Sequence, residues 1–199
     1  MAAKDPLDNV LAGVKSSGTI PRLLLHCCCA PCASYVLERL SPFFNITCLF
    51  YNPNIMPEEE HVKRLVGLHK LVSLAEYPNK VDIEEPQYSP EDYSSTVLRF
   101  PDGPEGGPRC RACFEVRLEE TARRAASSGY DYFTTTLSVS PHKDVSLINE
   151  IGQYQAIRFG GLFLSADFKK RDGYRRSVDL SKQYGLYRQD YCGCKRGLD

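Results

Sequence analysis

The sequence lacks the features that mark secreted and membrane-spanning proteins. Its first twenty residues contain Lys, Asp, Ser and Gly but no continuous apolar stretch, so we expect no secretory signal peptide. No segment approaches the ~18 consecutive apolar residues that a membrane-spanning helix requires. We therefore expect a soluble, cytoplasmic protein with no membrane partner.

Internal repeats and low-complexity tracts are also missing, and cysteine is too scarce for a small disulfide scaffold. Nine cysteines among 199 residues fall below the ~8–10% that such scaffolds contain. A chain of this length forms one domain, or at most two small ones, with a sizeable core. In a cytoplasmic protein of this kind, clustered thiols more often bind metal or perform redox chemistry than form structural disulfides.

What the sequence does contain is cysteine in three groups, with Cys48 alone outside them. The groups, in chain order, are Cys27-Cys28-Cys29-x-x-Cys32, Cys110-x-x-Cys113 and Cys192-Gly193-Cys194. A core that uses cysteine only as a small apolar residue has no need to bunch it in this way. The grouping predicts that distant parts of the chain converge on one inorganic centre that binds iron and sulfur.

Strand-like and helix-like segments alternate along the chain. We expect strands over 22–26, 46–51, 81–83, 132–137 and 162–164, and helices over 31–40, 57–72, 90–100, 113–127, 144–157 and 177–184. This alternation favours an α/β, Rossmann-like fold, with an open parallel sheet and helices on both faces. We expect residues 1–18 to form a loose N-terminal segment, and 19–199 to form a single catalytic domain that carries the metal site and ends in a cysteine-bearing tail.

The first cysteine group directly follows the strand expected over 22–26. In open α/β sheets, sites form at the carboxyl ends of the strands. Neighbouring residues of a strand point to opposite faces, so Cys28 and Cys29 share a centre only if the chain has already turned out of the strand. Pro31 suits an early helix position, which would put Cys32 in the first helical turn, where the helix dipole favours a thiolate.

Cys110 and Cys113 lie just before or at the start of another expected helix, where the same dipole acts. Two thiolates from each of the first two groups give four ligands, which suits a [4Fe-4S] cluster. Structural zinc is the alternative, because tetrahedral four-cysteine sites use similar pairs, although the adjacent Cys28-Cys29 pair is unlike the usual zinc knuckle. Cys27 and Cys48 lie in strand-like stretches, where we expect core residues.

The third group, Cys192-Gly193-Cys194, indicates a different chemistry. A disulfide across one intervening residue closes a small ring with poor geometry, which makes the bond easy to reduce. Such a pair suits an electron relay better than a structural bridge. A pair of free thiols at a frayed chain end is the alternative.

Charge is unevenly spread, although the net charge of the whole chain is zero. Residues 151–199 carry an excess of five positive charges over negative ones, and five cations lie within residues 169–176, around Tyr174. Such a segment could bind phosphates, with the tyrosine ring stacked on a base or sugar. A solvated loop with surplus charge explains this stretch equally well.

Five ordered motifs resemble the QueH family of epoxyqueuosine reductases, over roughly residues 22–195. The motifs are Cys28-Cys29-Ala30-Pro31-Cys32, Tyr51-Asn52-Pro53-Asn54-Ile55, Arg109-Cys110-x-x-Cys113-Phe114-x-x-Arg117-Leu118, Phe133-Thr134-Thr135-Thr136-Leu137-x-Val139-Ser140-Pro141 and Gly185-Leu186-Tyr187-Arg188-Gln189-x-Tyr191-Cys192-Gly193-Cys194. The resemblance implies a fold of the adenine-nucleotide-hydrolase-like type. It also implies the last step of queuosine biosynthesis in tRNA, the reduction of the epoxide of epoxyqueuosine to an alkene.

The resemblance assigns roles to individual cysteines. It implies that the cluster ligands are Cys28, Cys29, Cys110 and Cys113, and that Cys192 and Cys194 form a redox-active disulfide. Family members hold an additional iron beside the cluster, for which we expect Cys32 and Asp167 to be the ligands. The expected partners are tRNA carrying epoxyqueuosine and an external electron donor whose identity the sequence does not give.

The reaction needs two electrons and two protons. A cluster supplies electrons one at a time, and an open iron acts as a Lewis acid on the epoxide oxygen. The candidates for the proton donor are a cysteine thiol, His26, His142, Asp167 and Tyr191, although structural roles are the more usual ones for both histidines. The candidates for contacts with anticodon-loop phosphates are Arg188, Lys169, Lys170 and Arg171, and residues 134–136 either line the pocket or are ordinary strand threonines.

Two other functional classes remain as alternatives. A tRNA-modifying ATPase of the PP-loop type needs a glycine-rich phosphate loop after the first strand, and residues 26–32 contain no glycine, which disfavours it. A zinc-stabilised RNA-binding module without redox activity would be colourless, would bind one zinc per chain and would leave the Cys192/Cys194 pair without a purpose.

Overall fold

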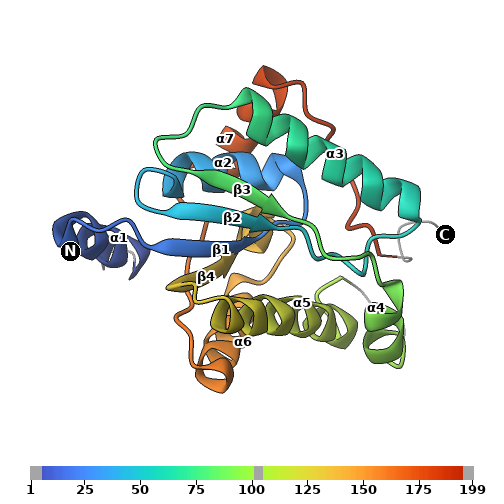
Figure 1. Cartoon of the computed structure of the whole chain (residues 1–199). Coiled ribbons are helices and arrows are strands. Elements are labelled where there is room, and N and C mark those ends of the chain that lie inside the picture. Colours follow the sequence, from blue (N-terminus) through green and yellow to red (C-terminus); the bar gives the residue numbers. More distant parts are fainter. Residues whose placement is uncertain (1–5, 101–104, 195–199) are drawn as a thin grey trace.

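Four parallel strands form the central sheet of the computed structural model, which describes residues 6–100 and 105–194 (Figure 1). Their order across the sheet is β3-β2-β1-β4, with bounds β1 Arg22–His26, β2 Asn45–Leu49, β3 Val81–Glu84 and β4 Tyr132–Thr135. The strand β1 pairs in parallel with β2 on one side and with β4 on the other. The expected α/β class, with an open parallel sheet, is confirmed.

Helices cover both faces of this sheet (Figure 1). On one face lie α2 (Ala30–Leu40), α3 (Glu58–Leu74) and α7 (Gly173–Gln183), and on the other lie α5 (Pro108–Ser127) and α6 (Val145–Phe159), with α4 (Pro90–Val97) packed on α5. Leu23 and Leu25 of β1 pack into the first core, and Leu24 packs into the second. A strand buried on both faces reads as a continuous apolar run, which explains the sequence of β1. None of the described helices combines the length and apolar character needed to span a membrane.

Three expected strands are shorter in the structure, and the one expected over 46–51 ends at Leu49, as β2. The stretch 162–164 forms a single bridge, in which the Phe133 backbone N donates to Leu162 O (2.9 Å) and the Leu164 N donates to Phe133 O (2.9 Å). The strand β4 ends at Thr135 because the hydroxyl of Thr135 accepts a hydrogen bond from Leu137 N (3.1 Å) and caps a 3-10 helix, η1 (Thr136–Val139). A side chain that captures a nearby backbone N–H in this way competes with strand pairing.

The loose N-terminal segment that the sequence suggested is wrong for residues 6–17, which form helix α1 (Pro6–Ser17). Leu7, Leu11 and Val14 are buried in the core. Asp8 forms ion pairs with Arg39 (2.6 Å) and with Arg171. The helical spacing of the three apolar residues was the available signal, and residues 1–5 lie outside the described residues.

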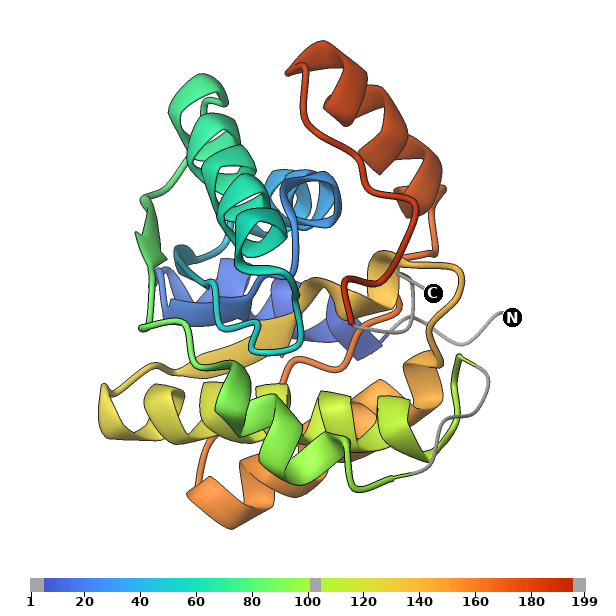
Figure 2. The ribbon, with the colours of Figure 1, turned by 90° about the vertical axis from the view of Figure 1, so that its right-hand side faces the viewer.

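The order in which strands are added to the sheet reverses between β1 and β4, although all four strands are parallel. From β1 it proceeds through β2 to β3 at one edge, and it then returns past β1 to add β4 on the other side. A ligand-binding crevice in such sheets forms where the strand order reverses, at the carboxyl ends of the strands. Figure 2 looks onto this end of the sheet, where the loops that follow β1 and β4 lie.

We predict that Leu11→Ala lowers the free energy of unfolding by about 3 kcal/mol, because it leaves a cavity where α1 packs on the core. Urea unfolding followed by circular dichroism measures this change. The exposed residue Asn9 on the same helix provides the control, and Asn9→Ala should have little effect. Equal stability of Leu11→Ala and the unchanged protein would contradict the docking of α1.

Candidate metal and redox site

The first cysteine group gathers three thiols at the carboxyl end of β1. The strand ends at His26 and helix α2 begins at Ala30, so the chain leaves the strand before Cys29, as the sequence required. The Cys28 and Cys29 sulfurs are 3.8 Å apart, and these two and the Cys32 sulfur all lie within 4.8 Å of one another. Three thiols at this spacing are close enough to bind one metal ion.

The end of β4 supports this group from the other side. The Thr136 hydroxyl lies 3.4 Å from Cys28 N, which donates to it, and 3.7 Å from the Cys28 sulfur. Thr134, in contrast, donates its hydroxyl to Leu164 O (2.8 Å) inside the core, as an ordinary strand threonine does. Of these threonines, it is therefore Thr136, in η1, that contacts a cysteine of the first group.

Cys27 and Cys48 are fully buried in the hydrophobic core. The Cys27 thiol donates to Leu25 O at 3.4 Å, and burial raises the pKa of Cys27 well above its ordinary value. A neutral thiol in an apolar core is not poised to bind metal. This placement agrees with the expectation that both residues belong to the core.

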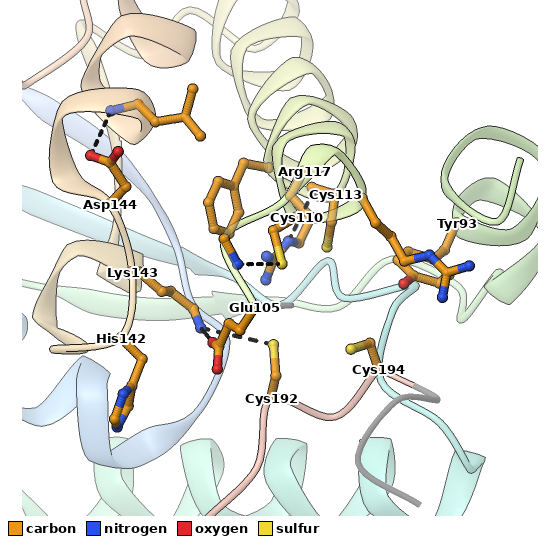
Figure 3. A pocket seen from close by; sticks show the side chains of 14 residues that line it. Tyr93, Glu105, Cys110, Cys113, Arg117, His142, Lys143, Asp144, Cys192 and Cys194 are labelled. Carbon is orange, nitrogen blue, oxygen red and sulfur yellow. Dashed lines mark hydrogen bonds and ion pairs between the residues drawn. The ribbon is translucent and has the colours of Figure 1, made fainter. Parts of the chain in front are cut away.

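The second and third cysteine groups face each other across a narrow hollow of about 30 Å³ (Figure 3). Cys110 and Cys113 lie three residues apart in the first turns of α5, and Cys192 and Cys194 reach the same hollow from the C-terminal tail. The Cys110 sulfur accepts a hydrogen bond from Gly106 N (3.3 Å). The tail pair therefore lies beside the Cys110/Cys113 pair.

A larger hollow of about 330 Å³ adjoins the narrow one and contains Cys28, Cys29 and Cys32 in its wall. Some residues line both hollows, namely Glu105, Arg117, His142, Lys143 and Cys192. Among residues 6–100 and 105–194, Cys110 and Cys113 do not join the three thiols that lie within single-ion distance. Cys192 thus stands at the junction between the first and second cysteine groups.

Two cations that the sequence did not single out as functional face these thiols. Arg117 is only 2% exposed; its Nε donates to Cys113 O (3.2 Å), and its Nη2 has no hydrogen-bond partner among the described residues. The Lys143 ammonium lies 3.8 Å from the Cys192 sulfur and 3.7 Å from the Glu105 carboxylate. A buried cation requires nearby negative charge. The Glu105 carboxylate supplies it to Lys143, and cysteines that lose their protons would supply it to Arg117.

The pKa values of the thiols in the first group are shifted in opposite directions. Hydrogen bonds from Cys29 and Cys32 lower the pKa of Cys28 well below its ordinary value, against the opposing effect of burial. The same hydrogen bond to Cys28 raises the pKa of Cys29 to about 12. Cys28 is therefore the thiol of this group that loses its proton most readily.

In the tail pair, the pKa of one thiol is also lowered. A hydrogen bond from Cys194 lowers the pKa of Cys192 well below its ordinary value, and the charges of Lys143 and Arg117 act in the same direction. Burial raises the pKa of Cys113 to about 11, although Arg117 partly opposes this effect. Cys192 is thus a thiol that loses its proton readily.

His26 is buried and neutral. Its Nε2 faces Tyr51 O (3.1 Å) and must donate, so its Nδ1 accepts from the Thr135 hydroxyl (2.9 Å). Burial lowers the pKa of His26 to about 4, and the charge of Arg117 adds to this effect. Because both ring nitrogens are occupied, His26 has a structural role and is not a suitable proton donor.

The other candidate proton donors differ in position. His142 is exposed and lines both hollows, and Tyr191 lines the larger one. The Asp167 carboxylate accepts a hydrogen bond from Lys169 N (3.1 Å) in the turn before α7, and Asp167 does not line either hollow. Its roles as an iron ligand and as a proton donor stay predictions.

Much of the basic segment 169–176 is used within the fold. The Lys169 ammonium donates to Lys143 O (3.1 Å), Arg171 pairs with Asp8, and the Arg176 guanidinium pairs with Glu38 (2.9 Å). These contacts join α7 and its preceding turn to the rest of the domain.

Tyr174 and Arg188, in contrast, both line the larger hollow. The Arg188 guanidinium lies 5.7 Å from the centre of the Tyr174 ring. Of the four residues suggested for phosphate contacts, Arg188 is the one beside the candidate site.

Comparisons with known proteins agree with the resemblance seen in the sequence. A family model described as "Epoxyqueuosine reductase QueH" matches residues 23–198. A protein of that name from Streptococcus pyogenes serotype M1 is 44% identical, over 87% of this chain and 69% of its own length. Relatives of the same name from Staphylococcus epidermidis (38% identical, 97% of this chain and 85% of its own) and Thermotoga maritima (35% identical, 86% and 88%) are also similar.

We predict that Lys143→Met slows the alkylation of Cys192 by iodoacetamide severalfold at pH 7. Loss of the ammonium removes one of the charges that lower the pKa of Cys192, so the thiolate forms only at higher pH. Mass spectrometry of the Cys192 peptide, across a pH series on reduced, metal-free protein, measures the rate.

Lys80→Met provides the control, because Lys80 pairs with Asp82 on the surface and lines neither hollow. An identical pH profile in Lys143→Met and the unchanged protein would show that Lys143 does not act on Cys192.

Proposed function

Because this chain belongs to the epoxyqueuosine reductase QueH family, an oxidoreductase family, we propose that it reduces the epoxide of epoxyqueuosine in tRNA to the alkene of queuosine. This step would be the last of queuosine biosynthesis. The observation that carries the proposal is the meeting of three cysteine groups, from three distant segments, at two adjoining hollows. The proposal includes an iron–sulfur cluster and a redox-active Cys192/Cys194 pair.

Cys28, Cys29, Cys110 and Cys113 are the proposed ligands of a [4Fe-4S] cluster. All four line the adjoining hollows, and soft thiolates suit iron–sulfur centres. A cluster held by four thiolates is anionic, which fits the unpartnered Nη2 of the buried Arg117 at the wall common to both hollows. When bound, such a cluster supplies electrons one at a time, and an open iron polarises an oxygen atom as a Lewis acid.

Cys32 and Asp167 complete the proposed metal centre as ligands of an additional iron. The closeness of Cys32 to Cys28 and Cys29 supports its part in this assignment. Asp167 has no comparable support from the geometry of the hollows. A zinc ion at Cys28, Cys29 and Cys32 is the alternative occupant, and it would accompany RNA binding without redox chemistry.

The proposed reaction balances with one dithiol. Both C–O bonds of the epoxide break, a C=C bond forms, and the oxygen leaves as water after taking up two protons and two electrons. A Cys192 thiolate and a Cys194 thiol together hold two electrons and one proton, and release them as the S–S bond forms; His142 at the wall of the hollows would supply the second proton. An external electron donor then returns the pair to the dithiol.

The larger hollow is the proposed position of the modified base. Its volume of about 330 Å³ lies within the range of small-molecule sites. Chemistry on a base requires that the base leave its stack, and an aromatic side chain receives such a base well. Tyr174 would stack on the base and Arg188 would contact a phosphate, with His142 at the wall as a proton donor to the departing oxygen.

A cytoplasmic location is part of the same proposal. Several cysteines of the site, including Cys28, Cys110 and Cys192, are only half-buried and are not in disulfides. Thiols of this kind persist in a reducing compartment.

Oxygen-free purification followed by iron, sulfide and zinc analysis tests the metal centre. We expect four or more irons with matching sulfide and a brown band near roughly 400 nm. Cys110→Ala should abolish this absorption while tRNA binding persists, because the thiolate ligand is lost and the fold is retained. Cys48→Ala, a cysteine-to-alanine change in the core, should keep the cluster.

One zinc per chain without colour would contradict the proposed cluster and favour the RNA-binding alternative. A full-strength cluster in Cys110→Ala would contradict the ligand assignment alone.

We predict that Cys192→Ser keeps the cluster and tRNA binding but reduces turnover at least about a hundredfold, because the pair no longer holds two reducing equivalents. Loss of the epoxide from tRNA, followed by nucleoside mass spectrometry, measures turnover. Turnover equal to that of the unchanged protein would show that the tail pair is dispensable.

A further inference from the structure

A buried ion pair on α3 lies under the C-terminal tail. The Arg64 Nε donates to the Glu60 carboxylate (2.7 Å), one helical turn away, and Arg64 is only 3% exposed. The Glu60 carboxylate also accepts a hydrogen bond from the Tyr187 hydroxyl (3.2 Å) in the tail. The pair is therefore oriented from one side by its own helix and from the other by the tail.

The remaining N–H groups of Arg64 reach the backbone of the redox pair. Nη1 donates to Cys192 O (3.1 Å), and Nη2 donates to Tyr191 O (3.4 Å). The next carbonyl, of Gly193, accepts from Met56 N (2.9 Å) in the turn before α3. Three consecutive carbonyls are thus fixed to this region, where the tail returns toward the middle of the view in Figure 2.

Gly193, between the two cysteines, fits against the same guanidinium. Its φ of +95° lies in the left-handed region that favours glycine. A Cβ at this position would lie 2.9 Å from Arg64 Nη2 and 3.0 Å from Nη1. The glycine of the Cys-Gly-Cys motif therefore allows both the turn of the chain and the close approach of Arg64.

Other contacts attach the tail elsewhere along α3. The Lys70 ammonium donates to Gly185 O (2.7 Å) at an exposed position, and the Lys63 ammonium lies 3.5 Å from the centre of the Tyr187 ring. These contacts hold parts of the tail that precede the cysteines. Arg64 differs because it binds the carbonyl of Cys192 itself, from a buried position.

We propose that Arg64 is a positioning residue that stabilises the dithiol form of the Cys192/Cys194 pair; this inference rests on the redox role proposed above. In the structure the two sulfurs are not bonded to each other, and Arg64 holds the carbonyl of Cys192. Disulfide formation must bring the two sulfurs together across Gly193, which changes the backbone that Arg64 holds. Because these hydrogen bonds favour the backbone of the dithiol form, Arg64 makes the disulfide easier to reduce.

Equilibration of the full-length protein with glutathione buffers tests this role. Two thiols lose two protons and two electrons as the S–S bond forms, and one glutathione disulfide takes them up to give two glutathione thiols. Thiol trapping and mass spectrometry of the tail peptide measure the ratio of dithiol to disulfide. We expect Arg64→Met to shift the equilibrium about tenfold toward the disulfide, the size expected for losing charged hydrogen bonds.

Matched variants separate this role from general docking of the tail. Arg64→Lys keeps the charge but loses the two-pronged contact, so its equilibrium should lie between those of Arg64→Met and the unchanged protein. Lys70→Met removes an exposed tail contact and should leave the equilibrium unchanged. A shift in Lys70→Met as large as that in Arg64→Met would overturn the specific role of Arg64.

A second variant covers the case in which Arg64→Met does not fold. Gly193→Ala keeps Arg64 but pushes its guanidinium away from the carbonyls, so we expect a shift in the same direction. An unchanged equilibrium in a folded Arg64→Met, or in Gly193→Ala, overturns the inference about Arg64 alone. The absence of any Cys192–Cys194 disulfide in the unchanged protein would instead refute the proposed redox pair, and the inference with it.

Discussion

Parallel pairing of β1 with β4 determines where the candidate site of this protein lies. The register, which sets His26 opposite Thr135, ends both strands at the same level of the sheet. The turn after β1 then carries Cys28 and Cys29 to the first residues of η1, where Thr136 contacts Cys28. Because the strand order reverses here, helices diverge from this edge and leave the two hollows in which the cysteine groups meet.

A site built from buried cysteines also needs positively charged side chains nearby. Thiolates are costly to bury unless cations compensate them, and Arg117, Lys143 and Arg64 lie at the walls of the hollows. The hydrogen-bond partners of these cations differ. Arg64 is paired with Glu60, while Arg117 retains an N–H without a partner among the described residues. The first arrangement holds the protein's own tail, and the second leaves a donor for an anionic cofactor at the wall common to both hollows.

Local pattern was enough to predict most of the fold and the cysteine content of the site. Strand β1 is a run of apolar residues, and the position of Cys28 directly after it predicted a site at the carboxyl edge, where the structure has it. Helix α1 was missed although the sequence carries signals for it, with Pro6 at its first position, Gly18 directly after its end and apolar residues at helical spacing between them. Arg117 and Lys143 were not predicted as functional, because a cation becomes significant only when the fold buries it beside thiols. The same limit applies to Arg64, which is more than a hundred residues from the peptide that it binds.

The proposed reaction depends on delivery of two electrons by the tail pair at this site. A single-turnover experiment, with fully reduced protein, tRNA carrying epoxyqueuosine and no external donor, tests it most directly. Nucleoside analysis and thiol trapping on the same samples compare the alkene formed with the state of Cys192 and Cys194. We expect one alkene for each Cys192–Cys194 disulfide formed. Alkene formation with the pair still fully reduced would contradict it.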